Sequence, residues 1–235
     1  MTFTTRTEHV TVADGTFDLH VWSPEGGQGP AVLLIQEIFG VGPYIRAVAE
    51  RLAKAGYVVG APDVFWRFAP RWVAGHDQEG LAASLQEVGK MDGEKAVADC
   101  IAALDRLASE PGVSGRPAVL GFCLGGTLAW GVAAMGDPSC CVSYYGSGVS
   151  GMLGMIEMVR CPVLFHFGDA DPYISNEAVA SIKAAIVGRD GFELNVESAG
   201  HAFDNHEAPM FYNEPCAAAA WAKTMEFLGT HVPIR

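Results

Sequence analysis

The chain has 235 residues, of which 50% are hydrophobic, and its 27 acidic and 15 basic side chains give a formal net charge of −12 at pH 7. This size and composition predict a single domain over residues 1–235, and the negative field argues against nucleic acid or an anionic membrane surface as a partner. The N-terminus lacks the pattern of a secretory signal, and six cysteines without CxxC spacing are typical of reduced thiols, so we expect a cytoplasmic protein.

A β-hairpin is predicted at the start, because residues 7–12 and 16–22 alternate polar and apolar side chains around a turn. Short apolar runs then alternate with amphipathic segments. The predicted strands are 31–35, 57–61, 117–120, 140–144, 163–167 and 194–196, and the predicted helices are 43–55, 93–107, 124–135, 176–187 and 215–228. This alternation predicts an α/β fold with a mostly parallel central sheet and helices on both faces.

Two segments need a separate interpretation. Residues 65–90 begin rich in Trp, Arg and His, and we expect them to form a flap or helical excursion over the site. Residues 117–136 carry no charge and are long enough to cross a bilayer. Because their pattern changes halfway from strand to helix, we interpret them as a buried core element instead.

Sites in such sheets gather in the loops that follow the carboxyl ends of the strands. Cys123 lies in the sequence GFCLGG, directly after a predicted strand and before a helix. A nucleophile at this kind of turn projects above the sheet, and the helix N-terminus favours its thiolate. The alternative is a cysteine that only packs in a tight turn.

Asp171 and His201 follow later strands, so the order along the chain is nucleophile, acid, base. His201 can take the thiol proton and later activate water, while Asp171 fixes the tautomer of the imidazole. Asp169 is the alternative acid. We expect all three groups at one rim of the sheet. No metal or other cofactor is predicted, since the His and Asp pairs lack the second pair that a metal site needs.

The loop after the first core strand holds Glu37 and two glycines. This architecture takes one of its oxyanion-hole amides from that loop, and we assign the two donors to the backbone N–H groups of Ile38 and Leu124. Glu37 lies between two apolar stretches, so full solvation of its carboxylate is not expected.

Six motifs together resemble the dienelactone hydrolases, also called carboxymethylenebutenolidases. They are QEIFG (36–40), APD (61–63), GFCLGG (121–126), YYG (144–146), GDAD (168–171) and AGHAF (199–203). The resemblance covers nearly the whole chain and implies the α/β-hydrolase fold with a triad of Cys123, His201 and Asp171. It also implies that Glu37 contacts the thiol and helps to control its ionisation, which is coherent because a carboxylate disfavours a neighbouring thiolate.

The substrate-binding part of the resemblance is incomplete. Dienelactone hydrolases hold a substrate carboxylate with arginines, and Asn205 stands here at one of those positions. Arg71 is a candidate replacement, with Arg67 as an alternative.

Apolar and aromatic candidates for the wall of the substrate pocket are Trp72, Tyr144 and Phe203. The sequence therefore predicts a hydrolase that opens a small enol-lactone through a cysteinyl thioester. A general carboxylesterase or thioesterase, and a non-catalytic ligand-binding or redox-sensing module, stay open as alternatives. The sequence does not indicate an oligomeric state.

Overall fold

The computed structural model describes residues 2–234, built around one eight-stranded sheet in the order β1-β2-β4-β3-β5-β6-β7-β8. The strands are β1 (Phe3–Val12), β2 (Gly15–Pro24), β3 (Ala31–Ile35), β4 (Val58–Pro62), β5 (Ala118–Phe122), β6 (Cys141–Tyr144), β7 (Val163–Gly168) and β8 (Phe192–Glu197). The β1–β2 hairpin is antiparallel and joins β4 antiparallel, whereas all neighbours from β4 to β8 are parallel. The mostly parallel sheet confirms the predicted α/β architecture.

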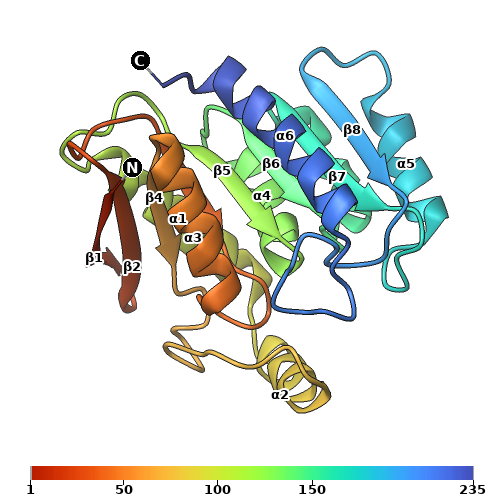
Figure 1. Cartoon of the computed structure of the whole chain (residues 1–235), viewed down its shortest axis with the longest axis horizontal. Coiled ribbons are helices and arrows are strands. Elements are labelled where there is room, and N and C mark those ends of the chain that lie inside the picture. The colour runs from red at the N-terminus through yellow and green to blue at the C-terminus, as the bar shows by residue number, and fades with distance from the viewer. Residues whose placement is uncertain (1, 235) are drawn as a thin grey trace.

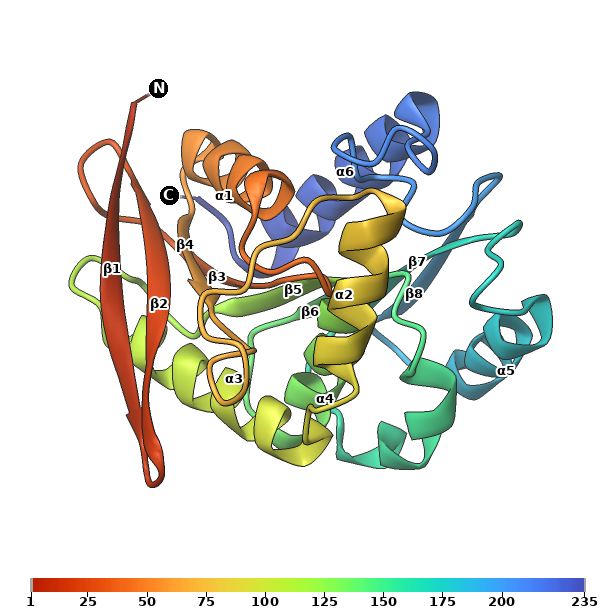
Figure 2. The same cartoon turned by 90° about the horizontal axis from the view of Figure 1, so that it is seen from below.

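Helices cover both faces of this sheet. They are α1 (Pro43–Ala55), α2 (Gln78–Val88), α3 (Gly93–Ala108), α4 (Leu124–Met135), α5 (Asn176–Ile186), α6 (Glu214–His231) and the 3₁₀ helix η1 (Val149–Met158). Helices α1 and α6 lie on one face and α3, α4 and α5 on the other (Figure 1 and Figure 2). Strands β3 to β7 are therefore buried along their whole length, which explains their continuous apolar sequences.

The limits of the helices follow from local capping. Asp77, Asp92 and Ser175 each accept a hydrogen bond from the backbone of the first turn of α2, α3 and α5. Helix α1 begins with Pro43 and ends at Ala55, and Gly56 caps it with a left-handed φ of 112°. The predicted limits of α1 and α4 agree with the structure at both ends, and every predicted strand overlaps an observed one.

The excursion between β4 and α3 contains helix α2, which lies across the carboxyl ends of the parallel strands (Figure 1 and Figure 2). Two buried carboxylates hold the loop that leads to it. Asp63 accepts hydrogen bonds from the amides of Phe65 and Arg71, and Asp99 of α3 accepts from the guanidinium of Arg67. These contacts fix the place where α2 crosses the edge of the sheet.

The uncharged segment 117–136 forms β5 and α4 at the centre of the molecule, as predicted. Within residues 2–234, no helix combines the length and apolarity needed to cross a bilayer.

The turn between β5 and α4 is packed backbone against backbone. A Cβ on Gly121 would lie 2.0 Å from the carbonyl oxygen of Gly125, and a Cβ on Gly125 would lie 2.3 Å from that of Ile35. Neither oxygen can move away without a shift of a strand or helix. Glycine at these positions therefore lets the N-terminus of α4 rest against the end of β3.

Alanine substitutions at two helical glycines test this packing. Gly125→Ala is expected to lower the free energy of unfolding by about 2 kcal/mol or more, because the backbone must shift to admit the methyl group. Gly229→Ala in α6, where nothing lies within 4 Å of the added Cβ, is the matched control and should be neutral or stabilising by up to about 1 kcal/mol. Urea unfolding followed by circular dichroism measures both; equal stability of the two variants would contradict the packing argument.

Candidate active site

Cys123 occupies the turn between β5 and α4 in a conformation that non-glycine residues rarely adopt, with φ 55° and ψ −115°. Its amide donates to the carbonyl of Tyr144 at 3.0 Å, and its own carbonyl accepts from the amide of Thr127 at 3.2 Å. These bonds hold the strained turn in place. The residue caps the N-terminus of α4, where the helix dipole stabilises negative charge on the sulfur.

Three side chains from separate loops form a continuous hydrogen-bonded chain. Cys123 Sγ lies 3.2 Å from His201 Nε2, and His201 Nδ1 lies 2.7 Å from Asp171 Oδ2. The other carboxylate oxygen of Asp171 accepts from the amides of Tyr173 at 2.8 Å and Ile174 at 3.1 Å. The structure thus brings together the thiol, imidazole and carboxylate that the sequence suggested.

Asp169, the alternative acid, lies elsewhere. It is exposed, and its carboxylate accepts a hydrogen bond from the hydroxyl of Ser198 at 3.1 Å. The acid that contacts the imidazole is therefore Asp171.

The charge state of His201 follows from its partners. Burial by itself lowers the pKa of this imidazole, but the hydrogen bonds and negative charges of Asp171 and Cys123 outweigh burial and raise the pKa to about 10. An imidazolium beside the sulfur is thus favoured at neutral pH, and it can hold a thiolate as an ion pair.

Cys123 and His201 open into a cavity of about 240 Å³, a size that suits a small molecule rather than a polymer. Most of its wall is apolar. The apolar residues are Ile38, Phe39, Leu81, Leu85, Val88, Leu124, Ala202, Ala208 and Phe211, and further lining residues include Glu37, His76, Ser147, Tyr173 and Asn205.

Helix α2 supplies one side of this wall through Leu81, Leu85 and Val88. Residues at this spacing lie on one face of a helix. These three residues are not among those predicted above to line the pocket, although their spacing is a signal that could have identified them. What the spacing does not show is that this face turns toward the sulfur.

The two assigned oxyanion donors both border the cavity beside Cys123. The close contact between Gly125 and Ile35 brings the loop after β3 next to the start of α4. Among the hydrogen bonds between residues 2–234, none has the amide of Ile38 or Leu124 as its donor. Both amides are therefore free to bind an oxygen on which negative charge develops.

Glu37 is only 2% exposed, as its apolar neighbours suggested. Its Oε2 accepts a hydrogen bond from Asn205 Nδ2 at 2.7 Å and lies 3.6 Å from His76 Nε2. The hydrogen bonds of the described chain, residues 2–234, include none between Glu37 and Cys123, whose sulfur faces His201 instead. The hydrogen bond that Glu37 makes is with Asn205, and the contact with the thiol that the resemblance implies stays a prediction.

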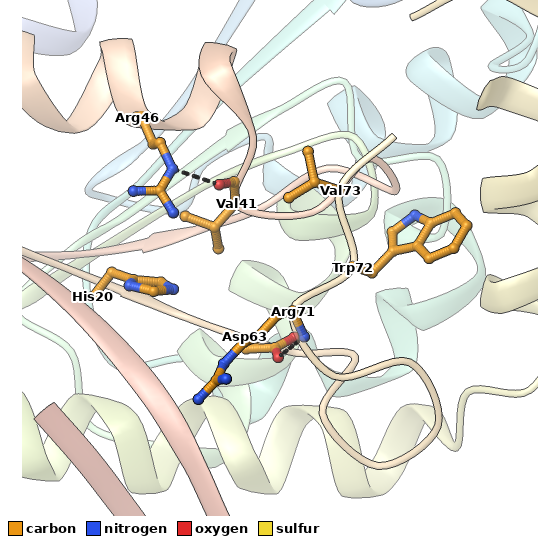
Figure 3. A pocket seen from close by; sticks show the side chains of 7 residues that line it. All are labelled: His20, Val41, Arg46, Asp63, Arg71, Trp72 and Val73. Atoms are coloured by element: carbon orange, nitrogen blue, oxygen red, sulfur yellow. Dashed lines mark hydrogen bonds between the residues drawn. The ribbon is translucent and has the colours of Figure 1, made fainter. Parts of the chain in front are cut away.

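The structure does not support Arg71 and Trp72 as substrate-binding residues. The exposed guanidinium of Arg71 donates to Asp18 at 2.8 Å, and the indole of Trp72 donates to Ser84 at 3.2 Å. Both border a different hollow, whose other lining residues are His20, Val41, Arg46, Asp63 and Val73 (Figure 3). The amide of Arg71 donates to Asp63 after β4 and its guanidinium donates to Asp18 in β2, and these two bonds hold the loop beside those strands.

Tyr144 and Phe203 do not reach the cavity either, since both are completely buried. The hydroxyl of Tyr144 lies 2.6 Å from that of Thr224 in α6, and the ring of Phe203 packs edge-on against Tyr145 with 5.4 Å between ring centroids. Tyr145 in turn lies 5.1 Å from the imidazole of His201. These aromatic side chains support the site from beneath.

Comparison with known proteins gives a consistent result over almost the whole chain. The model of the dienelactone hydrolase family matches residues 17–232. The carboxymethylenebutenolidase of Pseudomonas sp. (strain P51) is 38% identical over 221 residues, which cover 94% of this chain and 92% of that protein. Carboxymethylenebutenolidase 1 of Cupriavidus pinatubonensis is 32% identical and covers 91% of this chain and 92% of its own length.

Solved structures agree in fold. A dienelactone hydrolase of Anabaena variabilis superposes with a TM-score of 0.73 at 19% identity, covering 98% of this chain and 99% of that one. The dienelactone hydrolase-like promiscuous phosphotriesterase P91 from metagenomic libraries has a TM-score of 0.82 at 23% identity, with the same coverage. These likenesses show the α/β-hydrolase fold.

The pH dependence of the free energy of unfolding tests the ion pair between His201 and Asp171. Folding raises the pKa of His201 from 6.5 to about 10, so the stabilisation is complete below pH 6.5 and is lost as the pH rises toward 10. The free energy of unfolding of the wild type should therefore fall more steeply over this interval than that of Asp171→Asn, whose imidazole lacks the carboxylate. Urea unfolding at a series of pH values measures the difference.

Asp169→Asn is the control for this experiment, because it removes the neighbouring carboxylate that does not touch the imidazole. It should keep the pH dependence of the wild type. If all three proteins showed parallel curves, His201 would not be held by Asp171 as described.

Proposed function

This chain belongs to the dienelactone hydrolase family, and from this premise we propose that it opens a lactone ring by nucleophilic catalysis through Cys123. The observation that carries the proposal is the hydrogen-bonded chain of sulfur, imidazole and carboxylate, with separations of 3.2 Å and 2.7 Å. Cys123 and His201 line a small, mostly apolar cavity, which supplies a place for the substrate.

In the first half of the reaction, the sulfur of Cys123 attacks the carbonyl carbon of the lactone while His201 holds the thiol proton. The carbonyl oxygen becomes negatively charged and binds the amides of Ile38 and Leu124. The ring C–O bond then breaks, and the departing enolate oxygen takes the proton from His201. An enolate is a suitable leaving group, because a poorer alkoxide would let the attack reverse by expelling the thiolate.

In the second half, His201 takes a proton from a water molecule, which attacks the thioester carbonyl. The same two amides bind the oxyanion, the C–S bond breaks, and the sulfur recovers a proton. The product is the ring-opened carboxylic acid. Asp171 holds Nδ1 of His201 in its protonated form throughout, so that Nε2 faces the reacting atoms.

Glu37 has a proposed part in setting the ionisation of the thiol. It borders the same cavity as Cys123 without a hydrogen bond to it, so its influence is exerted by charge through space. A substrate that occupies the cavity and binds the carboxylate would weaken this influence and make the thiolate more favourable.

Cys123→Ala tests the nucleophile. It is expected to lower kcat/KM for an enol-lactone by at least about 10³-fold. When a lactone ring opens, the acyl part and the leaving oxygen remain in one molecule. The thioester on Cys123 should therefore carry the full mass of the substrate, which mass spectrometry of wild-type protein quenched during turnover can detect. Cys161→Ala, which alters a half-buried thiol outside the cavity, is the control and should retain activity. Rapid alkylation of Cys123 in a protein without any lactone or ester hydrolysis would favour a redox or binding role instead.

Glu37→Gln tests the control of ionisation. Loss of the negative charge should raise the rate at which iodoacetamide alkylates Cys123, several-fold at neutral pH. Glu226→Gln removes an exposed charge on α6 and should leave that rate unchanged. An unchanged alkylation rate and unchanged turnover in Glu37→Gln would show that this carboxylate does not act on the sulfur.

A further inference from the structure

One end of the cavity is polar but has no permanent cation. Glu37, His76 and Asn205 meet there, and the described residues that line the cavity include no lysine or arginine. The carboxylate of Glu37 is almost fully buried. A carboxylate on the substrate would be desolvated beside this like charge without a compensating partner. This end of the cavity therefore selects against an anion.

Two buried polar atoms at the same end have no hydrogen-bond partner within residues 2–234. They are Oε1 of Glu37 and Nε2 of His76, on side chains that are 2% and 8% exposed. Leaving such atoms unpaired is costly, so a site lined by them favours a ligand that pairs them. Both residues line the cavity, and a rotation of their side chains turns these buried atoms toward a bound molecule.

The chemistry of the two atoms defines the group that fits. The carboxylate oxygen of Glu37 accepts hydrogen bonds, and a protonated Nε2 of His76 donates one. A hydroxyl can donate to the first and accept from the second. A carboxylate can only accept, and a methyl group can do neither.

His76 is held in position to take part. Its ring packs against Phe39, with 4.2 Å between the ring centroids, and Asp77 beside it caps the start of α2. From there the apolar face of α2 continues along the cavity with Leu81 and Leu85. The polar end and the apolar wall are thus two parts of one surface.

We infer that the substrate is uncharged and carries a hydroxyl group, which binds between Glu37 and His76 while an apolar body lies along α2. This inference rests on the proposed lactone hydrolysis and specifies its substrate class. Asn205 takes part by holding Glu37 in place and by leaving this end of the cavity without a positive charge.

Three enol-lactones that differ in one exocyclic substituent test the inference. With hydroxymethyl, methyl and carboxyl substituents, kcat/KM of the wild type should be highest for hydroxymethyl, about tenfold lower for methyl, and at least about 100-fold lower for carboxyl. Turnover of methyl equal to that of hydroxymethyl would overturn the hydroxyl site. Preference for the carboxyl compound would overturn the whole inference and leave lactone hydrolysis standing. Failure to open any of the three would overturn the proposed function.

Two variants test which residues select the substituent of the substrate. His76→Phe keeps an aromatic ring against Phe39 and removes Nε2, so the ratio of kcat/KM between hydroxymethyl and methyl should fall toward one, through KM rather than kcat. Asn205→Arg adds a cation beside Glu37 and should raise the ratio of carboxyl to methyl by about tenfold or more. Arg71→Ala, outside the cavity, is the control and should leave both ratios unchanged.

Circular dichroism checks that each variant is folded, and the two ratios are measured independently. An unchanged hydroxymethyl-to-methyl ratio in His76→Phe would overturn the hydroxyl site. An unchanged carboxyl-to-methyl ratio in Asn205→Arg would show that charge at this end does not select the substrate.

Discussion

The contact between α4 and the end of β3 is the constraint on which the site depends. Because Gly125 has no side chain, the start of α4 rests against the carbonyl of Ile35. The same approach places the strained turn of Cys123 beside the loop that carries Ile38. This backbone contact therefore helps to set the sulfur and both free amides relative to one another.

The positions of the other catalytic residues depend on the packing of helices against both faces of the sheet. Helices on both faces fix the strands, and the loops after β7 and β8 carry Asp171 and His201 to the same edge as Cys123. Below them, Tyr144, Phe203 and other aromatic side chains fill the space between the sheet and α6. The catalytic groups thus rest on a packed layer, which limits how far the imidazole can move from the sulfur.

Most of the sheet, and the residues of the hydrogen-bonded triad, could be predicted from the sequence because both depend on local patterns. Apolar runs mark buried parallel strands, and polar residues after them mark one edge. The pocket wall could not be predicted in this way. Arg71 and Trp72 lie away from Cys123 because Asp63 and Asp18 hold their loop, and the pairing with Asp18, 53 residues away, leaves no local signal. Tyr144 is buried because α6, distant in sequence, covers it.

The excursion that carries His76 and α2 joins the sheet between β4 and α3, and neither of these elements holds a member of the triad. Mutations there can reshape the apolar wall while the sulfur and its partners stay in place. The residues that perform the reaction and the residues of this wall thus belong to different parts of the chain. Substitutions in this one segment can therefore change which molecules bind without removing the nucleophile, the base or the acid.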